Sequence, residues 1–281
     1  MNWGIRRRGR ARIGACCAVV VLTVLAGCSG DDGDDATTPD TAVGTTVAPE
    51  PIQVLVTNDD GVDADGIDVV VEGLRSLEGV EVTVVAPATN QSGTGGQTTD
   101  GPLTVTDATT RSGYPATAVE GFPADSVVWA IDQGGVDIEP DLVISGLNAG
   151  QNMGPAVDLS GTVGAARAAA RRGIPAIAAS QGLGDPPDFA AGWAQVETWF
   201  EQHRAAIADG TLSASTVANL NIPTCATGTV RGQVQAIVST SLDGYADPPD
   251  CSSTAPDPGV DIPAFGVGFA PLSELSPTPP S

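Results

Sequence analysis

Short apolar runs alternate with longer segments of helical periodicity, and this alternation limits the fold more than any other feature. The runs that predict buried strands are residues 52–57, 80–86, 141–145, 174–179 and 217–222. Apolar residues recur at helical spacing over residues 66–77, 124–132, 162–172 and 188–207. Parallel strands need such helical crossovers between them. The sequence therefore predicts an α/β fold, a Rossmann-like three-layer sandwich with a mostly parallel sheet.

Two further segments depart from this alternation. Residues 103–106 and 116–119 predict a hairpin inserted between the second and third parallel strands. Beyond Pro223 the pattern thins into Gly, Pro and Asp, and we expect only a short C-terminal β extension there. Cys225 and Cys251 lie in this region without a neighbouring Cys or His, which argues against a metal role. We predict that they form a disulfide, which would stabilise the fold by roughly 3.5 kcal/mol.

The N-terminus has the pattern of an export signal. Five arginines precede an apolar run over residues 13–25, which is too short to span a bilayer comfortably. Leu-Ala-Gly-Cys at residues 25–28 resembles the lipobox of bacterial lipoproteins, in which the Cys is acylated; the alternative is an ordinary secretory signal. We expect a signal peptide over residues 1–27, a lipid on Cys28, and attachment to the extracytoplasmic face of the cell membrane. Residues 28–51, rich in Asp, Thr and Pro, predict a disordered tether before a folded domain at 52–281.

The charge balance narrows the class of ligand. Without residues 1–27 the chain retains seven basic and 34 acidic residues, a net charge of −27. Nucleic-acid polymers are poor partners for such a surface, because their affinity comes largely from Lys and Arg at the phosphates. A small anionic substrate is compatible with it only where the local field is reversed. A bound divalent cation does that.

Polar loops follow several of the predicted strands. They comprise residues 58–61 (Asn-Asp-Asp-Gly), 90–93 (Asn-Gln-Ser-Gly) and 146–154, with Ser-Gly-Thr at 160–162 opening a helix. Alone, the first predicts a turn and the last an ordinary N-cap. Together they meet at the carboxyl edge of the sheet, where α/β folds bind ligands. Asp59 and Asp60 would repel each other there without a cation, and oxygen ligands favour Mg²⁺, Mn²⁺ or Ca²⁺ over zinc.

The order of these motifs carries a family resemblance. Residues 54–67 resemble the opening of the SurE nucleotidase family, and residues 86–93 resemble its second motif. Residues 121–125, 145–150 and 160–163 are similar to its following blocks, in the same order. The likeness extends over nearly all of residues 52–275.

The resemblance implies a hydrolase of the 5'-nucleotidase or acid-phosphatase-like type, which removes phosphate from nucleoside monophosphates or other small phosphomonoesters with Mn²⁺ or Mg²⁺. By motif position the metal ligands fall on Asp59, Asp60, Ser92 and Asn148. Contacts to phosphate fall on Asn152, Gly161 and Thr162. Either Asp59 or Asp60 would be the catalytic carboxylate that activates water.

Several positions depart from the family pattern. Ala168 stands where the family usually has Glu, Leu159 where it has an aromatic residue, and Pro155 and Ala156 where acidic residues are common. These differences leave an alternative, a lipoprotein that binds a nucleotide or phosphate on the same fold without catalysis. The resemblance also leaves a homodimer open, although residues 225–261 are short beside the arm through which the family dimerises.

Overall fold

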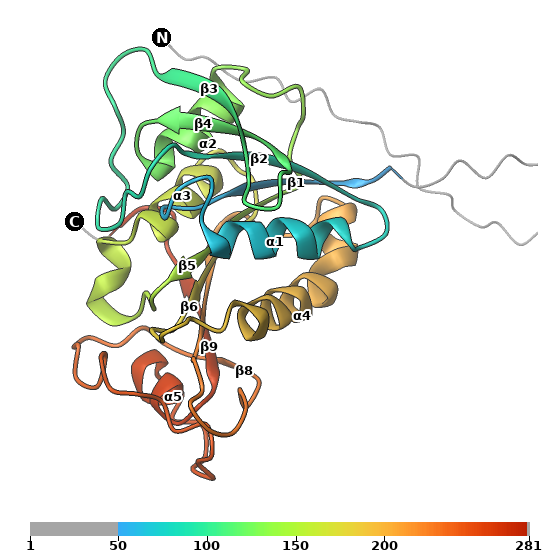
Figure 1. Cartoon of the computed structure of the whole chain (residues 1–281). Helices are drawn as coiled ribbons and strands as arrows, with labels where there is room; N and C mark the ends of the chain where they lie inside the picture. Colours follow the sequence, from blue (N-terminus) through green and yellow to red (C-terminus); the bar gives the residue numbers. More distant parts are fainter. Residues whose placement is uncertain (1–49, 280–281) are drawn as a thin grey trace, which may run out of the picture. The chain divides into compact units, whose positions relative to one another are not determined.

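The computed structural model describes residues 50–279, and its centre is a nine-stranded sheet. Figure 1 shows the sheet with helices on both faces. The strands are β1 Ile52–Thr57, β2 Val80–Pro87, β3 Thr104–Thr109, β4 Pro115–Glu120, β5 Leu142–Ala149, β6 Ala176–Gln181, β7 Val217–Ile222, β8 Gln233–Gln235 and β9 Ala270–Leu275. The helices are α1 Asp65–Arg75, α2 Pro123–Asp132, the 3₁₀ helix η1 Gly154–Asp158, α3 Gly161–Ala170, α4 Phe189–Ala208 and α5 Asp261–Gly266.

The strand order is β3-β4-β2-β1-β5-β6-β7-β9-β8. The six strands from β4 to β7 are mutually parallel, whereas β3 pairs antiparallel with β4 and β9 pairs antiparallel with β7. This mostly parallel sheet between two helical layers confirms the predicted fold class.

Each face of the sheet has its own apolar core. On one face α1 buries Ile67, Val70, Val71 and Leu74, at the spacing of a single helical stripe, beside α4. On the other face α2 and α3 pack together against the sheet (Figure 1). The small residues of α3 permit close approach, because a Cβ on Gly164 would lie 2.0 Å from the carbonyl oxygen of Gly95. The Ala-rich composition of α3 therefore reflects tight packing on both of its sides.

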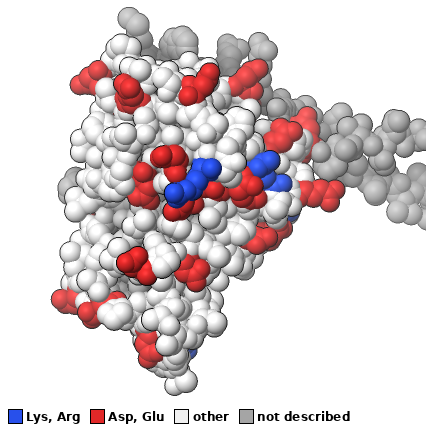
Figure 2. Space-filling view, in the orientation of Figure 1, with Lys and Arg blue, Asp and Glu red and all other residues white. Residues whose placement is uncertain are grey.

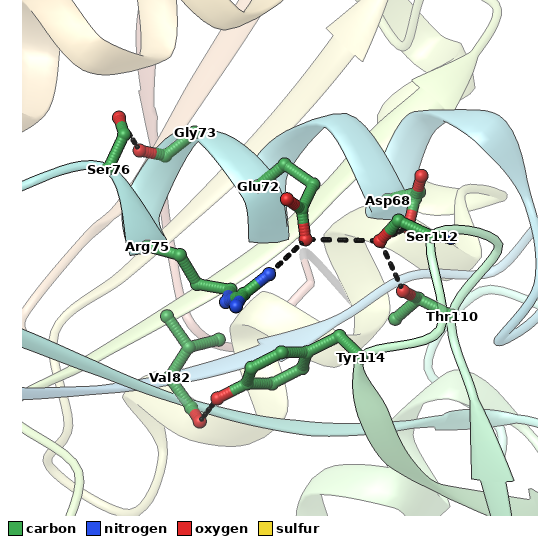
Figure 3. A network of polar contacts seen from close by, with 9 residues as sticks. All are labelled: Asp68, Glu72, Gly73, Arg75, Ser76, Val82, Thr110, Ser112 and Tyr114. Carbon is green, nitrogen blue, oxygen red and sulfur yellow. Dashed lines mark hydrogen bonds and ion pairs between the residues drawn. The ribbon is translucent and has the colours of Figure 1, made fainter.

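The hairpin is present but is more than an insertion. β4 pairs in parallel with β2 and so belongs to the main sheet, which the sequence prediction missed. Polar contacts hold the β3–β4 turn against α1 and β2 (Figure 3). Ser112 donates through both N–H and Oγ to Asp68, at 2.9 and 2.7 Å, and the Tyr114 hydroxyl donates to the Val82 carbonyl at 2.8 Å. The Ser112 contacts are exposed and the Tyr114 contact is half-buried, so together they orient the turn rather than define the fold.

β5 also differs from expectation. We predicted a strand that ends at Ser145 and a loop after it, but the strand continues to Ala149 across an irregularity in its pairing with β6. Gly146 makes this continuation possible, since it has φ 144° and a Cβ there would lie 2.3 Å from the Ala179 carbonyl oxygen. The strand consequently carries Asn148 to the carboxyl end of the sheet, where it pairs with Ser180 on β6.

The C-terminal region is more ordered than its composition indicates. β9 inserts between β7 and β8, and α5 precedes it. A disulfide joins Cys225 to Cys251, whose Cα atoms are 5.7 Å apart. The disulfide closes a loop of chain that includes Tyr245, which is hydrogen-bonded to Gln151 in the loop after β5.

The surface is acidic over the face that α1 covers. Figure 2 shows carboxylates spread across this face, with its few arginines bordered by acidic side chains. In the part of the chain that the structure describes, no helix combines the length and the apolar character needed to cross a bilayer. The expected signal peptide, Cys28 and most of the expected tether lie outside the described residues.

Candidate metal and phosphate site

The candidate site lies where the strand order reverses. The chain passes from β1 outward to β2 and β4, and then returns to place β5 on the other side of β1. Loops that leave adjacent strands at such a point diverge and form a crevice at the carboxyl ends of the strands. Asp59 and Asp60 follow β1, and Asn148 ends β5, so these predicted residues come from the two strands that flank the crevice.

Asp59 is the buried member of the carboxylate pair, with 2% of its surface exposed. Its Oδ1 accepts a hydrogen bond from the Thr162 hydroxyl at 2.7 Å. Ser160 caps α3 by accepting from the Val163 N–H at 3.1 Å. A Cβ on Gly161 would lie 2.8 Å from the Asp59 Cβ, so only glycine permits this approach. Gly161 and Thr162, both predicted phosphate contacts, thus lie directly against Asp59.

Asp60 connects two other loops. One of its oxygens accepts from the Asn90 side-chain amide at 3.1 Å and the other from the Ala149 backbone N–H at 2.9 Å. Ser92, a predicted ligand, is exposed in the same loop as Asn90, and its N–H donates to the Asn90 side chain at 2.9 Å. The backbone carbonyl of Asp59 accepts from Gln91 at 2.7 Å. The loop of residues 90–93 is therefore held against the aspartate pair, although no hydrogen bond joins the Ser92 hydroxyl to either carboxylate.

Asn148 and Asn152 are joined through a neighbouring strand. Asn148 is the register partner of Ser180 on β6, and the Asn152 side-chain amide donates to the Ser180 hydroxyl at 2.9 Å. The Asn148 amide nitrogen donates to the Gly150 carbonyl at 2.5 Å. Because the nitrogen is used in that bond, the amide oxygen of Asn148 is the atom available to a metal ion.

Two asparagines on β7 fix the backbone of Asn152. The Asn152 N–H donates to the Asn221 side chain at 2.6 Å, and the Asn152 carbonyl accepts from Asn219 and Asn221 at 2.9 and 3.1 Å. Both asparagines are buried. A pair of Asn residues at i and i+2 in an otherwise apolar strand was the sequence signal for this support, since such residues face the same side of a strand.

Electrostatics at the site is unfavourable without a cation. Burial raises the pKa of Asp59 to about 6, and the negative charge of Asp60 adds to the rise. Burial likewise raises the pKa of Asp60. The hydrogen bonds to both carboxylates come from neutral donors. Within residues 50–279 no arginine or histidine forms an ion pair with either of them.

The arginines of the described chain are all engaged elsewhere, and the full sequence contains no lysine. Four form ion pairs on the helices and one more with an aspartate before α3, and two bind backbone carbonyls: Arg75–Glu72, Arg111–Asp65, Arg172–Asp132, Arg204–Glu201, Arg167–Asp158, Arg171 to Pro277, and Arg231 to Val267 and Ala255. Side chains of residues 50–279 therefore supply no positive charge at the candidate site.

These observations fit a hard divalent cation. Two carboxylates with raised pKa values and an amide oxygen provide the ligand chemistry that Mg²⁺ and Mn²⁺ prefer. The described residues contain no group of three or more His, Cys, Asp or Glu arranged to hold a metal, so the set depends on Asn148 and Ser92 as well as the aspartates. His203 is not part of this donor set, because it lies in α4, half-buried and stacked on Trp199.

Comparisons with known proteins show what the chain is similar to. A family model described as survival protein SurE matches residues 54–242. The 5'-nucleotidase SurE of Paramagnetospirillum magneticum is 40% identical over 186 residues, which cover 66% of this chain and 68% of that protein. The 5'-nucleotidase SurE of Brevibacillus brevis is 35% identical over 203 residues, 70% of this chain and 75% of that one.

A solved structure shows the same fold. The crystal structure of the SurE protein from Aquifex aeolicus aligns with a TM-score of 0.63 at 24% identity, and covers 82% of this chain and 95% of that chain. At this identity the match establishes the architecture of the sheet and its helices.

Proposed function

Because the chain belongs to the SurE family, we propose that it is a metal-dependent phosphomonoesterase of the 5'-nucleotidase type, acting on nucleoside monophosphates. The observation that supports this best is the pair of a buried Asp59 and a half-buried Asp60 at the switch point of the sheet, without a cationic partner among the described residues. A module that only binds a nucleotide has no need of two adjacent carboxylates whose pKa values burial raises.

Each part of the site has a role in this proposal. Asp59, Asp60, Asn148 and Ser92 would hold Mn²⁺ or Mg²⁺. When bound, the cation supplies the positive charge that the phosphoryl group and the attacking water require. One carboxylate of the aspartate pair orients that water and takes its proton. The side chains of this protein would therefore position the attacking water and accept its proton.

The first turn of α3 and Asn152 would hold the phosphate. Backbone N–H groups at a helix N-terminus lack intrahelical partners and bind anions. Gly161 places that turn against Asp59, and Asn152 is held by β6 and β7. The phosphate is thereby recognised by neutral donors alone, which makes the enzyme depend on its cation for charge.

The activity is tested by phosphate release from adenosine 5'-monophosphate by the purified protein with Mn²⁺, with Mg²⁺ and with a chelator. We expect turnover with a metal, none with the chelator, and a loss of at least about 100-fold in kcat in Asp59→Asn. Asp63→Asn, an exposed carboxylate four residues further along, serves as the matched control and should retain activity. Tight nucleotide binding without turnover under any metal would instead favour the non-catalytic binding lipoprotein.

We also propose that the protein acts outside the cytoplasm, held to the membrane by a lipid on Cys28. The supporting features are the signal-like N-terminus, the Leu-Ala-Gly-Cys sequence and the tether-like composition of residues 28–51. In such a location the enzyme would act on external phosphomonoesters. Its negative surface charge would disfavour binding of polymeric nucleic acid.

A further inference from the structure

Leu183 is an apolar side chain in an unusual position. It is 61% exposed, one of four large hydrophobic side chains that the described surface presents openly, with Leu159, Ile237 and Leu242. It follows strand β6, and Ser180 within that strand accepts a hydrogen bond from the Asn152 side chain. An exposed leucine on a loose loop would need no explanation. The loop of Leu183, however, is fixed.

The backbone of Gly182 and Leu183 is hydrogen-bonded to two neighbouring segments. The Leu183 N–H donates to the Gln151 side chain at 3.0 Å, which joins it to the loop of Asn152. The preceding Gly182 donates to the Ile222 carbonyl at 2.6 Å and accepts from the Thr224 hydroxyl at 2.6 Å. The backbone that carries this exposed side chain is therefore held in place, and the exposure of the leucine has an unfavourable hydration free energy.

The side chain of Leu183 lies beside a candidate metal ligand. The position of a Cβ on Gly150 would be 3.4 Å from Leu183 Cδ2 and 3.9 Å from the Asn148 amide nitrogen. Gly150 has φ 134°, a conformation that other residues rarely adopt, so the gap between the leucine and Asn148 has no intervening side chain. The aliphatic side chain of Leu183 thus borders the candidate metal site, and we call this border the rim of the site.

We infer that Leu183 is a specificity residue, which packs against the organic leaving group of the substrate and so selects nucleoside monophosphates over phosphomonoesters with small polar leaving groups. This inference rests on the proposed function. The leaving group is bonded to the phosphate, so a phosphate held between Asn152 and α3 places it at this rim. A nucleoside has apolar faces that recover hydration free energy against leucine. Glycerol offers almost none.

The test compares kcat/KM for adenosine 5'-monophosphate with kcat/KM for glycerol 2-phosphate in full-length protein. In Leu183→Ala we expect the value for the nucleotide to fall about five- to tenfold, with that for glycerol 2-phosphate unchanged within about twofold. Leu183→Met should restore the preference, because it returns an apolar surface of similar size. Ile237→Ala is the matched control, since Ile237 is an aliphatic side chain that is 70% exposed and pairs through its backbone with Val260 rather than with the loop of Leu183.

A second readout does not depend on turnover. Adenosine has no phosphate, and its affinity as a competitive inhibitor reports the leaving-group surface alone. We expect its inhibition constant to rise in Leu183→Ala by the same factor as the loss for the nucleotide, and to stay unchanged in Ile237→Ala. Equal losses for both substrates, or an unchanged adenosine constant, would overturn the role of Leu183 while leaving a working phosphatase. Absence of turnover on either substrate in the unaltered protein would instead overturn the proposed function.

Discussion

Asp59 concentrates the conflict between stability and function in this protein. It is almost fully buried beside a second carboxylate, and its hydrogen bonds come only from neutral groups such as the Thr162 hydroxyl. Burial, and then the charge of Asp60, raises its pKa from 3.8 to about 6. The difference corresponds to about 3 kcal/mol of destabilisation when the group is ionised. Bound cation would remove that cost, so the site is stabilised by the ligand that it needs.

The pH dependence of stability follows from this shift. Asp59 binds its proton more tightly in the folded state than in the unfolded state, so its favourable effect is complete below about pH 4 and is lost as pH rises to about 6. In chelator, Asp59→Asn should therefore gain stability relative to the unaltered protein between pH 4 and pH 7, by about 3 kcal/mol. Urea unfolding at a series of pH values measures the gain. A constant offset is expected from altered hydrogen bonds to Thr162, so the change with pH is diagnostic, and parallel profiles would contradict it.

At the scale of elements, the loop after β5 depends on the C-terminal region. Asp261, at the start of α5, is fully buried and accepts from the N–H groups of Gly154, Ser239 and Ile262 at 2.7–2.8 Å. Gln151 donates to the Tyr245 carbonyl at 2.7 Å and its own carbonyl accepts from the Tyr245 hydroxyl. Tyr245 lies within the chain that the Cys225–Cys251 disulfide closes. The C-terminal region thus supports the loop that carries Asn152.

Removing one acceptor at Asp261 tests that support. Asp261→Asn replaces an oxygen that binds a backbone N–H by a donor, so a buried N–H loses its partner. We expect a loss of about 2 kcal/mol in the free energy of unfolding, with faster hydrogen exchange at the Gly154 amide. Asp257→Asn is the control, because Asp257 is exposed and accepts only from the nearby Gly259 N–H. Comparable losses in both variants would show that Asp261 is not a specific link to this loop.

The molecule has an acidic surface, whereas the function proposed for it requires binding of an anionic phosphate. The chain has no lysine, and every arginine in residues 50–279 has a protein partner. The surface as a whole therefore repels anions, and attraction depends on the cation site. An anionic membrane would repel the domain in the same way, so the proposed attachment would depend on the covalent lipid rather than on surface charge.

Lipid attachment is tested on the full chain in a bacterial host. We expect the unaltered protein to fractionate with membranes and to incorporate a labelled fatty acid, and Cys28→Ala to lose the label and leave the membrane fraction. Cys17→Ala is the control, because Cys17 is removed with the predicted signal peptide and should not affect anchoring. A Cys28→Ala protein that keeps both the label and the membrane association would exclude the proposed anchor.

The sequence alone determined the class of fold and the chemistry of the donors. Strand and helix periods are local properties, and Asp59 and Asp60 stand out because they follow a predicted strand in a parallel sheet, whereas the proposed role of Asn148 comes from the motif resemblance. Tertiary structure decided the rest. Only the three-dimensional structure shows that Asn90 donates a hydrogen bond to Asp60, that asparagines on β7 hold Asn152, and that β5 continues past Gly146. Contacts between residues distant in sequence follow from packing, which leaves no local periodicity, and for that reason the support of the site and the place of Leu183 beside it emerged only from the fold.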